Sequence, residues 1–363
     1  MRILQVNKRH WDHVGGIEKV VKDVAEVFSN LGYENSVLAV NEECKTDKLK
    51  LDQTFILKAS QLFVFLSMPV SISFFVWFRR LVKIHDVIIL HHPFPLAFLA
   101  YLMFGQHKPM VVWYHSDIVR QKTLAWVIRG ILNSVLNYSK AIIVSDESVF
   151  ETSVLLAPYK SKITVIPYAT SAVRKTDNYD SLLKTLQKPL ILAVGRLVYY
   201  KGYEYLIEAM KGVPATLLII GSGPLRESLS RQIQSLELSN IEIIDPVEDL
   251  SDYYFAADIF VLPSIEISEA FGLVQIEAMS AGVPVVNTNL PTAVPRVSQH
   301  NSTGLTVPPK DAIALNRALI ELINNPALRT QFGISGKVRV NEFYSYEAFR
   351  KNLSLLINLL RRE

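Results

Sequence analysis

The sequence has little cysteine and no long apolar segment near its start, the features that are typical of disulfide-bonded and secreted proteins. It contains one cysteine, Cys44, so no disulfide can form within the chain, and a reducing compartment is expected. No long apolar segment follows the opening Met-Arg-Ile-Leu-Gln-Val-Asn, which is typical of a short strand and not of a signal peptide. We therefore expect a cytoplasmic protein that is not secreted.

The chain has little excess charge of either sign. Its formal net charge is +4, and residues 1–168 hold 19 basic and 14 acidic side chains, whereas residues 169–363 hold 19 and 20. This excess is too small and too scattered for a nucleic-acid-binding surface, so no nucleic acid is expected as a partner. A basic N-terminal half is instead compatible with an anionic membrane surface.

The carboxylate pattern of a metal site is also missing. The sequence has no Asp-x-Asp motif, and no carboxylates stand at ligand spacing beside its histidines. We therefore predict neither a metal nor a cofactor. Cationic side chains and helix N-termini would then have to hold any phosphate group.

Half of the 363 residues are hydrophobic, and a chain of this length can form two domains with separate cores. Short apolar strands alternate with helices along both halves, which predicts an α/β fold with parallel sheets covered on both faces. We place an N-terminal domain at residues 1–168, a polar linker at 169–188, a C-terminal domain at 189–345 and a helix at 346–363. Ligands of such sheets bind at the carboxyl ends of the strands.

Residues 62–78 are seventeen residues without a charge, rich in Phe, Val and Leu. The length approaches that of a membrane span, but Pro69 and three serines interrupt the apolar run. Arg79, Arg80 and Lys83 follow at once. This pattern favours a pair of helices lying at a membrane interface. A buried core helix with a basic end is the alternative, and a transmembrane helix is disfavoured.

The segment Glu-Ala-Phe-Gly-Leu-Val-Gln-Ile-Glu at residues 269–277 carries the strongest chemical signal. Glu269 is expected in a loop and Glu277 inside the following helix. The unpaired backbone amides of Phe271, Gly272 and Leu273 then form a helix N-terminus that favours an anion. A phosphate beside these amides, with a carboxylate on either side to accept hydroxyl hydrogen bonds, describes a nucleotide-sugar site. An ordinary helix start with solvated glutamates is the alternative.

This segment, together with Glu-Ala-Met-Ser-Ala-Gly-Val-Pro-Val at 277–285, resembles the donor-site signature of glycosyltransferase family 4. The resemblance extends over nearly the whole chain. It implies the GT-B fold, in which two Rossmann-like, doubly wound domains face each other across a cleft and the last helix crosses back to the N-terminal domain. It also implies retaining sugar transfer. The string His-Ser-Asp-Ile-Val-Arg-Gln-Lys at 115–122 is similar to bacterial surface-polysaccharide mannosyltransferases, such as those that build O-antigen.

Two glycine-rich loops are candidates for the nucleotide pocket. Gly15 and Gly16 precede an amphipathic helix and resemble the family's Gly-Gly-x-Glu-Arg loop, with Lys19 in place of Arg. Gly221 and Ser222 follow an apolar strand. The Gly-x-Gly there is an incomplete dinucleotide fingerprint, because the third glycine is missing, so we expect a loop that lines the nucleotide pocket and not a nicotinamide site.

Arg196 and Lys201 follow the first strand of the second half, where two cations can converge on a diphosphate. The resemblance implies this role for both. It also implies that His115, after another apolar strand, contacts the donor sugar. His91 and His92 follow an equivalent strand and, with Asp117, are candidates for the acceptor side.

These observations predict a metal-independent, retaining hexosyltransferase that acts at the inner face of the cell membrane. It would move a hexose from a nucleotide sugar, with GDP-mannose as the first choice, to a lipid-linked or growing polysaccharide acceptor. Glu277 would hold the ribose hydroxyls, Arg196 and Lys201 the diphosphate, and Glu269 with His115 the sugar. No side chain is an obvious nucleophile, which favours front-face substitution assisted by the departing phosphate.

Other functions explain part of the same pattern. A nucleotide-sugar epimerase on a similar two-domain fold would use the same cations and Glu277, but would not need the apolar and basic segment at 62–83. A UDP-sugar-dependent transferase of the same family is a second alternative. A catalytically silent nucleotide-binding partner is a third, although the intact glutamates and cations of the donor motif argue against it.

Overall fold

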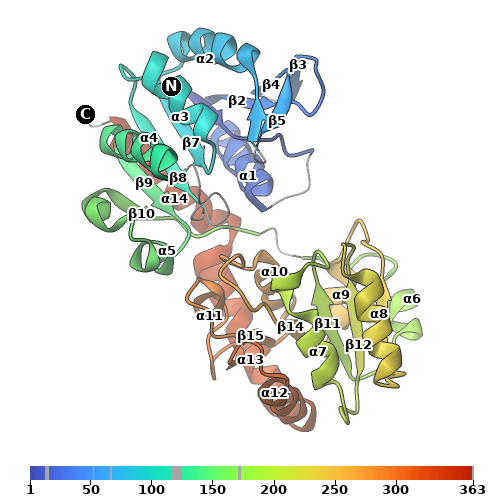
Figure 1. The fold of residues 1–363 in the computed structure, drawn as a ribbon. Coiled ribbons are helices and arrows are strands. Elements are labelled where there is room, and N and C mark those ends of the chain that lie inside the picture. The colour runs from blue at the N-terminus through green and yellow to red at the C-terminus, as the bar shows by residue number, and fades with distance from the viewer. Residues whose placement is uncertain (13–15, 52, 66–67, 116–124, 171–172, 362–363) are drawn as a thin grey trace. The chain divides into compact units, whose positions relative to one another are not determined.

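The computed structural model describes all residues except 13–15, 52, 66–67, 116–124, 171–172 and 362–363. The chain forms two compact units (Figure 1). Unit 1 comprises Met1–Tyr168 with Phe349–Glu363, and unit 2 comprises Ala169–Ala348. Residues 169–188, which the sequence suggests as a linker, belong to unit 2 and contain the helix α6 (Tyr179–Thr185). The last helix, α14 (Tyr346–Arg361), begins in unit 2 and continues into unit 1.

Unit 1 is built on an eight-stranded sheet that is parallel except for one edge strand. Its strands, in spatial order, are β10 (Ile163–Val165), β9 (Ala141–Val144), β8 (Met110–Tyr114), β7 (Val87–His92), β1 (Arg2–Val6), β2 (Glu34–Val40), β4 (Thr54–Ala59) and β3 (Asp47–Leu51). Only β3, which pairs with β4, runs antiparallel. The strand order reverses between β1 and β7, the kind of position at which doubly wound sheets bind ligands.

Helices cover both faces of this sheet, because most of its strands are apolar on both sides. The helices of unit 1 are α1 (Gly16–Asn30), α2 (Ile72–Ile84), α3 (Pro95–Phe104), α4 (Ala125–Tyr138), α5 (Glu147–Thr152) and the 3-10 helix η1 (Ala157–Lys162). A large core lies under α2, α3 and α4, and includes Leu4, Phe78 and Tyr114. On the opposite face, Val21 of α1 packs on Val37.

Residues 62–78 differ from the expected pair of helices. They form a two-stranded hairpin, β5 (Phe63–Phe65) with β6 (Met68–Val70), and then the start of α2. Pro69 is the reason, since proline is disfavoured inside a helix but is tolerated in an edge strand. Ser71 then begins α2 as its N-cap, where its hydroxyl accepts a hydrogen bond from the Phe74 amide at 3.1 Å.

Unit 2 has a six-stranded parallel sheet. Its spatial order is β13 (Ile241–Ile244), β12 (Thr216–Ile220), β11 (Leu190–Val194), β14 (Ile259–Leu262), β15 (Val285–Thr288) and β16 (Gly304–Val307). This is the order of a Rossmann-type sheet, with the reversal between β11 and β14. Both units are therefore doubly wound α/β domains, as the sequence predicts.

The remaining elements of unit 2 are mostly helical. They are the 3-10 helix η2 (Tyr199–Lys201), α7 (Tyr203–Ala209), α8 (Arg226–Ser235), α9 (Ser251–Ala256), α10 (Leu273–Ala281), α11 (Val294–Val297), α12 (Ala312–Asn324), α13 (Pro326–Arg339) and η3 (Val340–Tyr344). The core under α7, α8 and α12 includes Ile191, Leu206 and Leu319. Among the helices of the described residues, none has both the length and the apolar character that crossing a bilayer requires.

Candidate active site

The loops after β11 and β12 contact each other directly through their backbones. The Gly195 amide donates to the Ile220 carbonyl at 3.0 Å, and the Leu197 amide donates to the Ser222 carbonyl at 2.8 Å. A Cβ added to Gly221 would lie 2.0 Å from the Gly195 carbonyl oxygen, so no larger residue fits there. The predicted Gly221-Ser222 loop therefore lies beside the loop that carries Arg196.

A second close approach joins the Lys201 loop to the loop after β14. Gly202 has φ +67°, and a Cβ there would lie 2.3 Å from the Pro263 carbonyl oxygen. The Ile265 amide donates to the Tyr200 carbonyl at 2.8 Å. The reversal of strand order between β11 and β14 thus brings two distant parts of the sequence together at the carboxyl ends of both strands.

Lys201 and Glu269 form a buried ion pair at this point. The Lys201 ammonium lies 2.6 Å from Glu269 Oε2, and the two side chains are 11% and 10% exposed. The Ser264 hydroxyl donates to the same carboxylate oxygen at 3.0 Å. The sequence assigned Lys201 to the diphosphate and Glu269 to the sugar. In the structure, the two side chains neutralise each other.

The start of α10 has the conformation that the motif requires. Gly272 adopts a left-handed backbone with φ +74°, and α10 begins at Leu273. The buried Gln275 side-chain nitrogen donates to the Phe271 carbonyl at 2.9 Å and to the Val294 carbonyl at 3.2 Å. Sequence reasoning missed this role of Gln275, although its place in the first turn of the helix was a usable signal.

Glu277 lies one turn after the start of α10, and its side chain is half-buried. The Tyr254 hydroxyl donates to Glu277 Oε2 at 2.8 Å. Burial, followed by the negative charge of Glu277, raises the pKa of Tyr254 far above its usual range, so Tyr254 stays a neutral donor. Tyr254 orients the carboxylate that the sequence assigned to the ribose, and no sequence motif pointed to it.

The other predicted donor residues are less constrained. Arg196 and Ser222 are exposed. Gly16 is exposed at the first position of α1, and Gly15 lies outside the described residues. Within the described residues, no group of three or more His, Cys, Asp or Glu side chains could hold a metal ion.

The three candidate histidines of unit 1, His91, His92 and His115, lie at the carboxyl ends of β7 and β8. His91 and His115 stack with their ring centroids 5.3 Å apart, and His91 Nδ1 lies 3.0 Å from His115 Nε2. His92, its neighbour in β7, points to the opposite face of the sheet, where it is fully buried between Tyr114 and Phe98. The structure thus brings His91 to His115 on one face of the sheet and places the His92 side chain on the other face. Asp117 lies outside the described residues.

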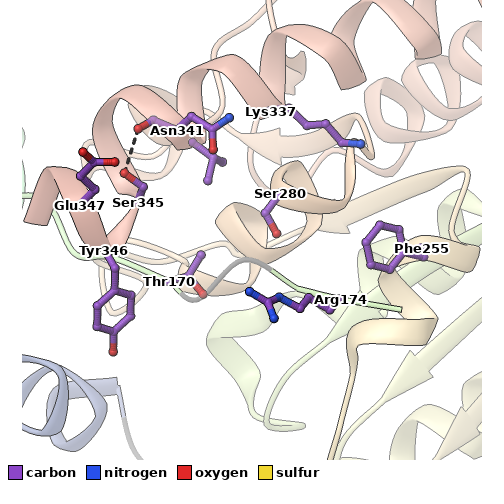
Figure 2. Close-up of a pocket in the computed structure, with 10 residues that line it drawn as sticks. Thr170, Arg174, Phe255, Ser280, Lys337, Asn341, Ser345, Tyr346 and Glu347 are labelled. Carbon is purple, nitrogen blue, oxygen red and sulfur yellow. Dashed lines mark hydrogen bonds between the residues drawn. The ribbon is translucent and has the colours of Figure 1, made fainter. Parts of the chain in front are cut away.

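A cavity of about 590 Å³ is found elsewhere in unit 2 (Figure 2). Its lining includes Thr170 and Arg174, which follow the boundary with unit 1, and Lys337 of α13. Ser280 of α10 also faces it, but none of the predicted donor residues belongs to the lining. This cavity is therefore separate from the Lys201–Glu269 pair.

Comparison with known proteins defines the class of protein. A family described as glycosyl transferases group 1 matches residues 174–339, and glycosyltransferase family 4 matches residues 14–171. The fold is shared with a sucrose-phosphate synthase of Thermosynechococcus elongatus, at TM-score 0.80 and 22% identity over 99% of both chains. It is also shared with Anabaena HepE in complex with UDP and glucose, at TM-score 0.81 and 16% identity over 99% of both chains.

Sequence relatives place the chain within this class. It is 30% identical to the D-rhamnosyltransferase WbpZ of Pseudomonas aeruginosa, over 95% of this chain and 92% of the relative. It is 28% identical to the O-antigen chain mannosyltransferase C of Escherichia coli, over 95% of each. The chain belongs to glycosyltransferase family 4 and is a transferase with the GT-B fold, which confirms the family indicated by the sequence.

Proposed function

We propose that this glycosyltransferase moves mannose, or the related 6-deoxy sugar D-rhamnose, from a GDP-linked donor to a growing, lipid-linked bacterial polysaccharide. The observation that carries the proposal is the Lys201–Glu269 pair at the carboxyl ends of β11 and β14. A buried cation next to a carboxylate can serve a diphosphate and a sugar hydroxyl of one donor molecule. The similarity to the rhamnosyl- and mannosyltransferases supports the choice of sugar.

The donor site would work without a metal. The Lys201 ammonium and the exposed Arg196 guanidinium would neutralise the charge that builds on the leaving diphosphate, aided by the N-terminal amides of α10. Glu269, freed from part of its contact with Lys201, would accept hydrogen bonds from the sugar. Glu277, oriented by Tyr254, would accept those of the ribose hydroxyls.

Retention of configuration would follow from front-face substitution. The Glu269 carboxylate accepts a hydrogen bond from Ser264 and would accept others from the sugar hydroxyls, which lowers its ability to attack the sugar. The departing phosphate oxygen would instead take the proton of the acceptor hydroxyl on the same face. The product anomer, determined by NMR, tests this directly: an inverted linkage contradicts front-face substitution.

Donor selection provides the test of the function. Purified enzyme should convert GDP-mannose or GDP-D-rhamnose in the presence of a polyprenyl-diphosphate-linked oligosaccharide, and should leave UDP-glucose unused. Comparing the two GDP-sugars shows whether the 6-hydroxyl is required. Consumption of UDP-glucose in preference to both would overturn the GDP-sugar assignment. Conversion of a donor to its epimer without an acceptor would overturn transferase activity.

Unit 1 has a surface suited to membrane contact. The hairpin residues Leu62, Phe63, Val64 and Phe65 are each at least half exposed. In α2 the exposed side chains share one face, at helical spacing: Ile72, Val76, Arg79, Arg80, Lys83 and Ile84. Apolar side chains beside cations match an anionic lipid surface. A lipid-linked acceptor would be presented there.

Vesicle sedimentation tests the membrane contact. Three basic residues contribute about 1 kcal/mol each near an anionic surface, so replacing Arg79, Arg80 and Lys83 with Glu should weaken binding to phosphatidylglycerol vesicles by at least about a hundredfold. Wild-type protein that stays in the supernatant at low salt would refute the proposal.

A matched control makes the same change in charge on the surface of unit 2. The exposed cations Lys184, Arg231 and Arg317 of unit 2, replaced together by Glu, produce the same change in net charge. That variant should retain most of the vesicle binding. Equal loss in both variants would show that net charge, and not the α2 surface, controls association.

A further inference from the structure

A chain of buried polar side chains extends from His115 into the sheet of unit 1. Tyr168 lies 2.6 Å from His115 Nδ1, and His91 lies 3.0 Å from His115 Nε2. His91 Nε2 lies 3.1 Å from the side-chain oxygen of Gln5, and the Gln5 amide nitrogen donates to Asn35 at 3.4 Å. All five side chains are buried, the most exposed being Tyr168 at 7%.

The sequence alternation within the strands puts these groups on one face. Gln5, His91, Trp113 and His115 occupy positions of the same parity along β1, β7 and β8 and just beyond, on the face that α1 covers. Trp113 stacks on both histidine rings, at 5.7 Å from His91 and 6.2 Å from His115. This packing fixes the planes of both rings, so the hydrogen-bonding direction of each nitrogen is set.

The orientation of the Gln5 amide sets the direction of the hydrogen bonds. Its nitrogen donates to Asn35 Oδ1, so its oxygen accepts from His91 Nε2–H. A neutral His91 then has only a lone pair at Nδ1, which accepts from His115 Nε2–H. A neutral His115 in turn has only a lone pair at Nδ1, which accepts the Tyr168 hydroxyl.

Both histidines are held neutral by their surroundings. Burial lowers the pKa of His91 to about 3, and burial with the neighbouring His91 and His92 lowers the pKa of His115 well below its usual value. Burial also raises the pKa of Tyr168, which therefore keeps its hydrogen. The direction of the chain is consequently the same over the whole physiological pH range.

We propose that Gln5 and His91 are positioning residues for His115: they hold its hydrogen on Nε2 and leave Nδ1 as an acceptor for a hydroxyl group. Tyr168 supplies that hydroxyl in the present structure. In the reaction, a hydroxyl of the sugar substrate takes its place, a step that rests on the proposed function. The recognition is specific for a hydrogen-bond donor and adds no charge beside the substrate.

The tautomer can be measured in the protein without any substrate. In ¹⁵N-histidine NMR spectra of the full chain, His115 should carry its hydrogen on Nε2 and show no titration between pH 5 and pH 8. His91→Leu removes the acceptor for that hydrogen, so the spectrum should change to a mixture of tautomers. A wild-type His115 with its hydrogen on Nδ1, or a His91→Leu variant with an unchanged His115 spectrum, would overturn the proposal.

Kinetics supply the second readout. The loss of one neutral hydrogen bond at His115 should lower kcat/KM about three- to tenfold in His91→Leu. His91→Asn places an amide oxygen near the position of Nδ1, so it should restore the Nε2 tautomer and most of the activity. Failure of His91→Asn to restore either one would show that the effect of His91 is general packing.

His85 provides a matched control in the same unit. It is also buried and makes two hydrogen bonds, to the Leu81 carbonyl at 2.7 Å and to the Ser36 hydroxyl at 2.8 Å. It precedes β7, at the amino-terminal end of the sheet, away from His115. His85→Leu should destabilise unit 1 and leave the His115 tautomer and the kcat/KM of the remaining folded enzyme unchanged. If the donor assignment is wrong, the kinetic arm fails for all variants, wild type included, while the NMR result still decides the proposal.

Discussion

Removal of Lys201 should destabilise unit 2 far more than removal of an exposed ion pair. The pair with Glu269 is nearly enclosed, at 11% and 10% side-chain exposure. Besides Lys201, the hydroxyl of Ser264 is bound to the same carboxylate oxygen. Lys201→Met leaves the Glu269 charge buried with only that hydroxyl, and breaking one side of a buried pair costs about 3–5 kcal/mol. The double variant Lys201→Met/Glu269→Gln removes both charges and should recover most of the loss.

The tryptophans allow the two units to be followed separately. All four, Trp11, Trp77, Trp113 and Trp126, belong to unit 1. In urea titrations, far-UV circular dichroism reports on both units, whereas tryptophan fluorescence reports on unit 1. Lys201→Met should lower the urea midpoint of the unit 2 transition, which is the part of the dichroism change that has no counterpart in fluorescence. The urea midpoint of unit 1, measured by fluorescence, should change little.

A control variant uses a pair of similar distance in open solvent. Arg226 lies 2.8 Å from Asp245, whose side chain is 80% exposed. Asp245→Asn should therefore cost no more than about 1 kcal/mol. If Lys201→Met also costs less than that, the Lys201–Glu269 pair is not the buried, ionised contact described above. If the double variant recovers turnover as well as stability, neither residue handles the donor.

Three further predictions concern the donor site and the histidines. Glu277→Ala should weaken donor binding by calorimetry roughly ten- to a hundredfold, because a charge-assisted hydrogen bond is lost, and unchanged affinity would remove Glu277 from the site. Turnover should persist in excess EDTA, whereas Arg196→Ala should lower the rate by about two to three orders of magnitude; loss on chelation with recovery on added Mn²⁺ would contradict this. Unit 1 should lose about 1.4 kcal/mol between pH 8 and pH 5.5 through His91 alone, because its pKa falls from 6.5 to about 3 on folding and only the unfolded state takes up the proton. The loss should continue as the pH falls towards 3, and His91→Asn, followed by fluorescence, should remove this share of it.

The sequence alone located many elements whose local signal is strong. Met110–Tyr114, Ala141–Val144 and Leu190–Val194 are continuous apolar runs bounded by polar residues, and each forms a buried strand, since such runs have few other uses in an α/β protein. Gly272 and Gly282, at the two ends of α10, have left-handed backbones that glycine adopts most readily. The family resemblance rested on these local motifs.

Local pattern failed where pairing with another segment decides the structure. Residues 62–78 have both helical and strand character, and the pairing of Phe63 with Val70 selects a hairpin for the first part. The strand β3 also depends on its partner, because residues 47–51, with alternating lysines, are recognisable as a strand only where they pair with β4 at the edge of the sheet. Edge strands depend on their neighbours more than on their own composition.

The chemistry of the site depended on tertiary structure even more strongly. The sequence supplied Lys201, Glu269, His91 and His115 as separate candidates, but their distances follow from strand order. The reversal between β11 and β14 brings Lys201 to Glu269, and the side-by-side pairing of β7 with β8 brings His91 to His115. Ionisation depends on burial and on neighbouring charges, so the neutral histidines and the buried ion pair could be recognised only once the sheets had assembled them.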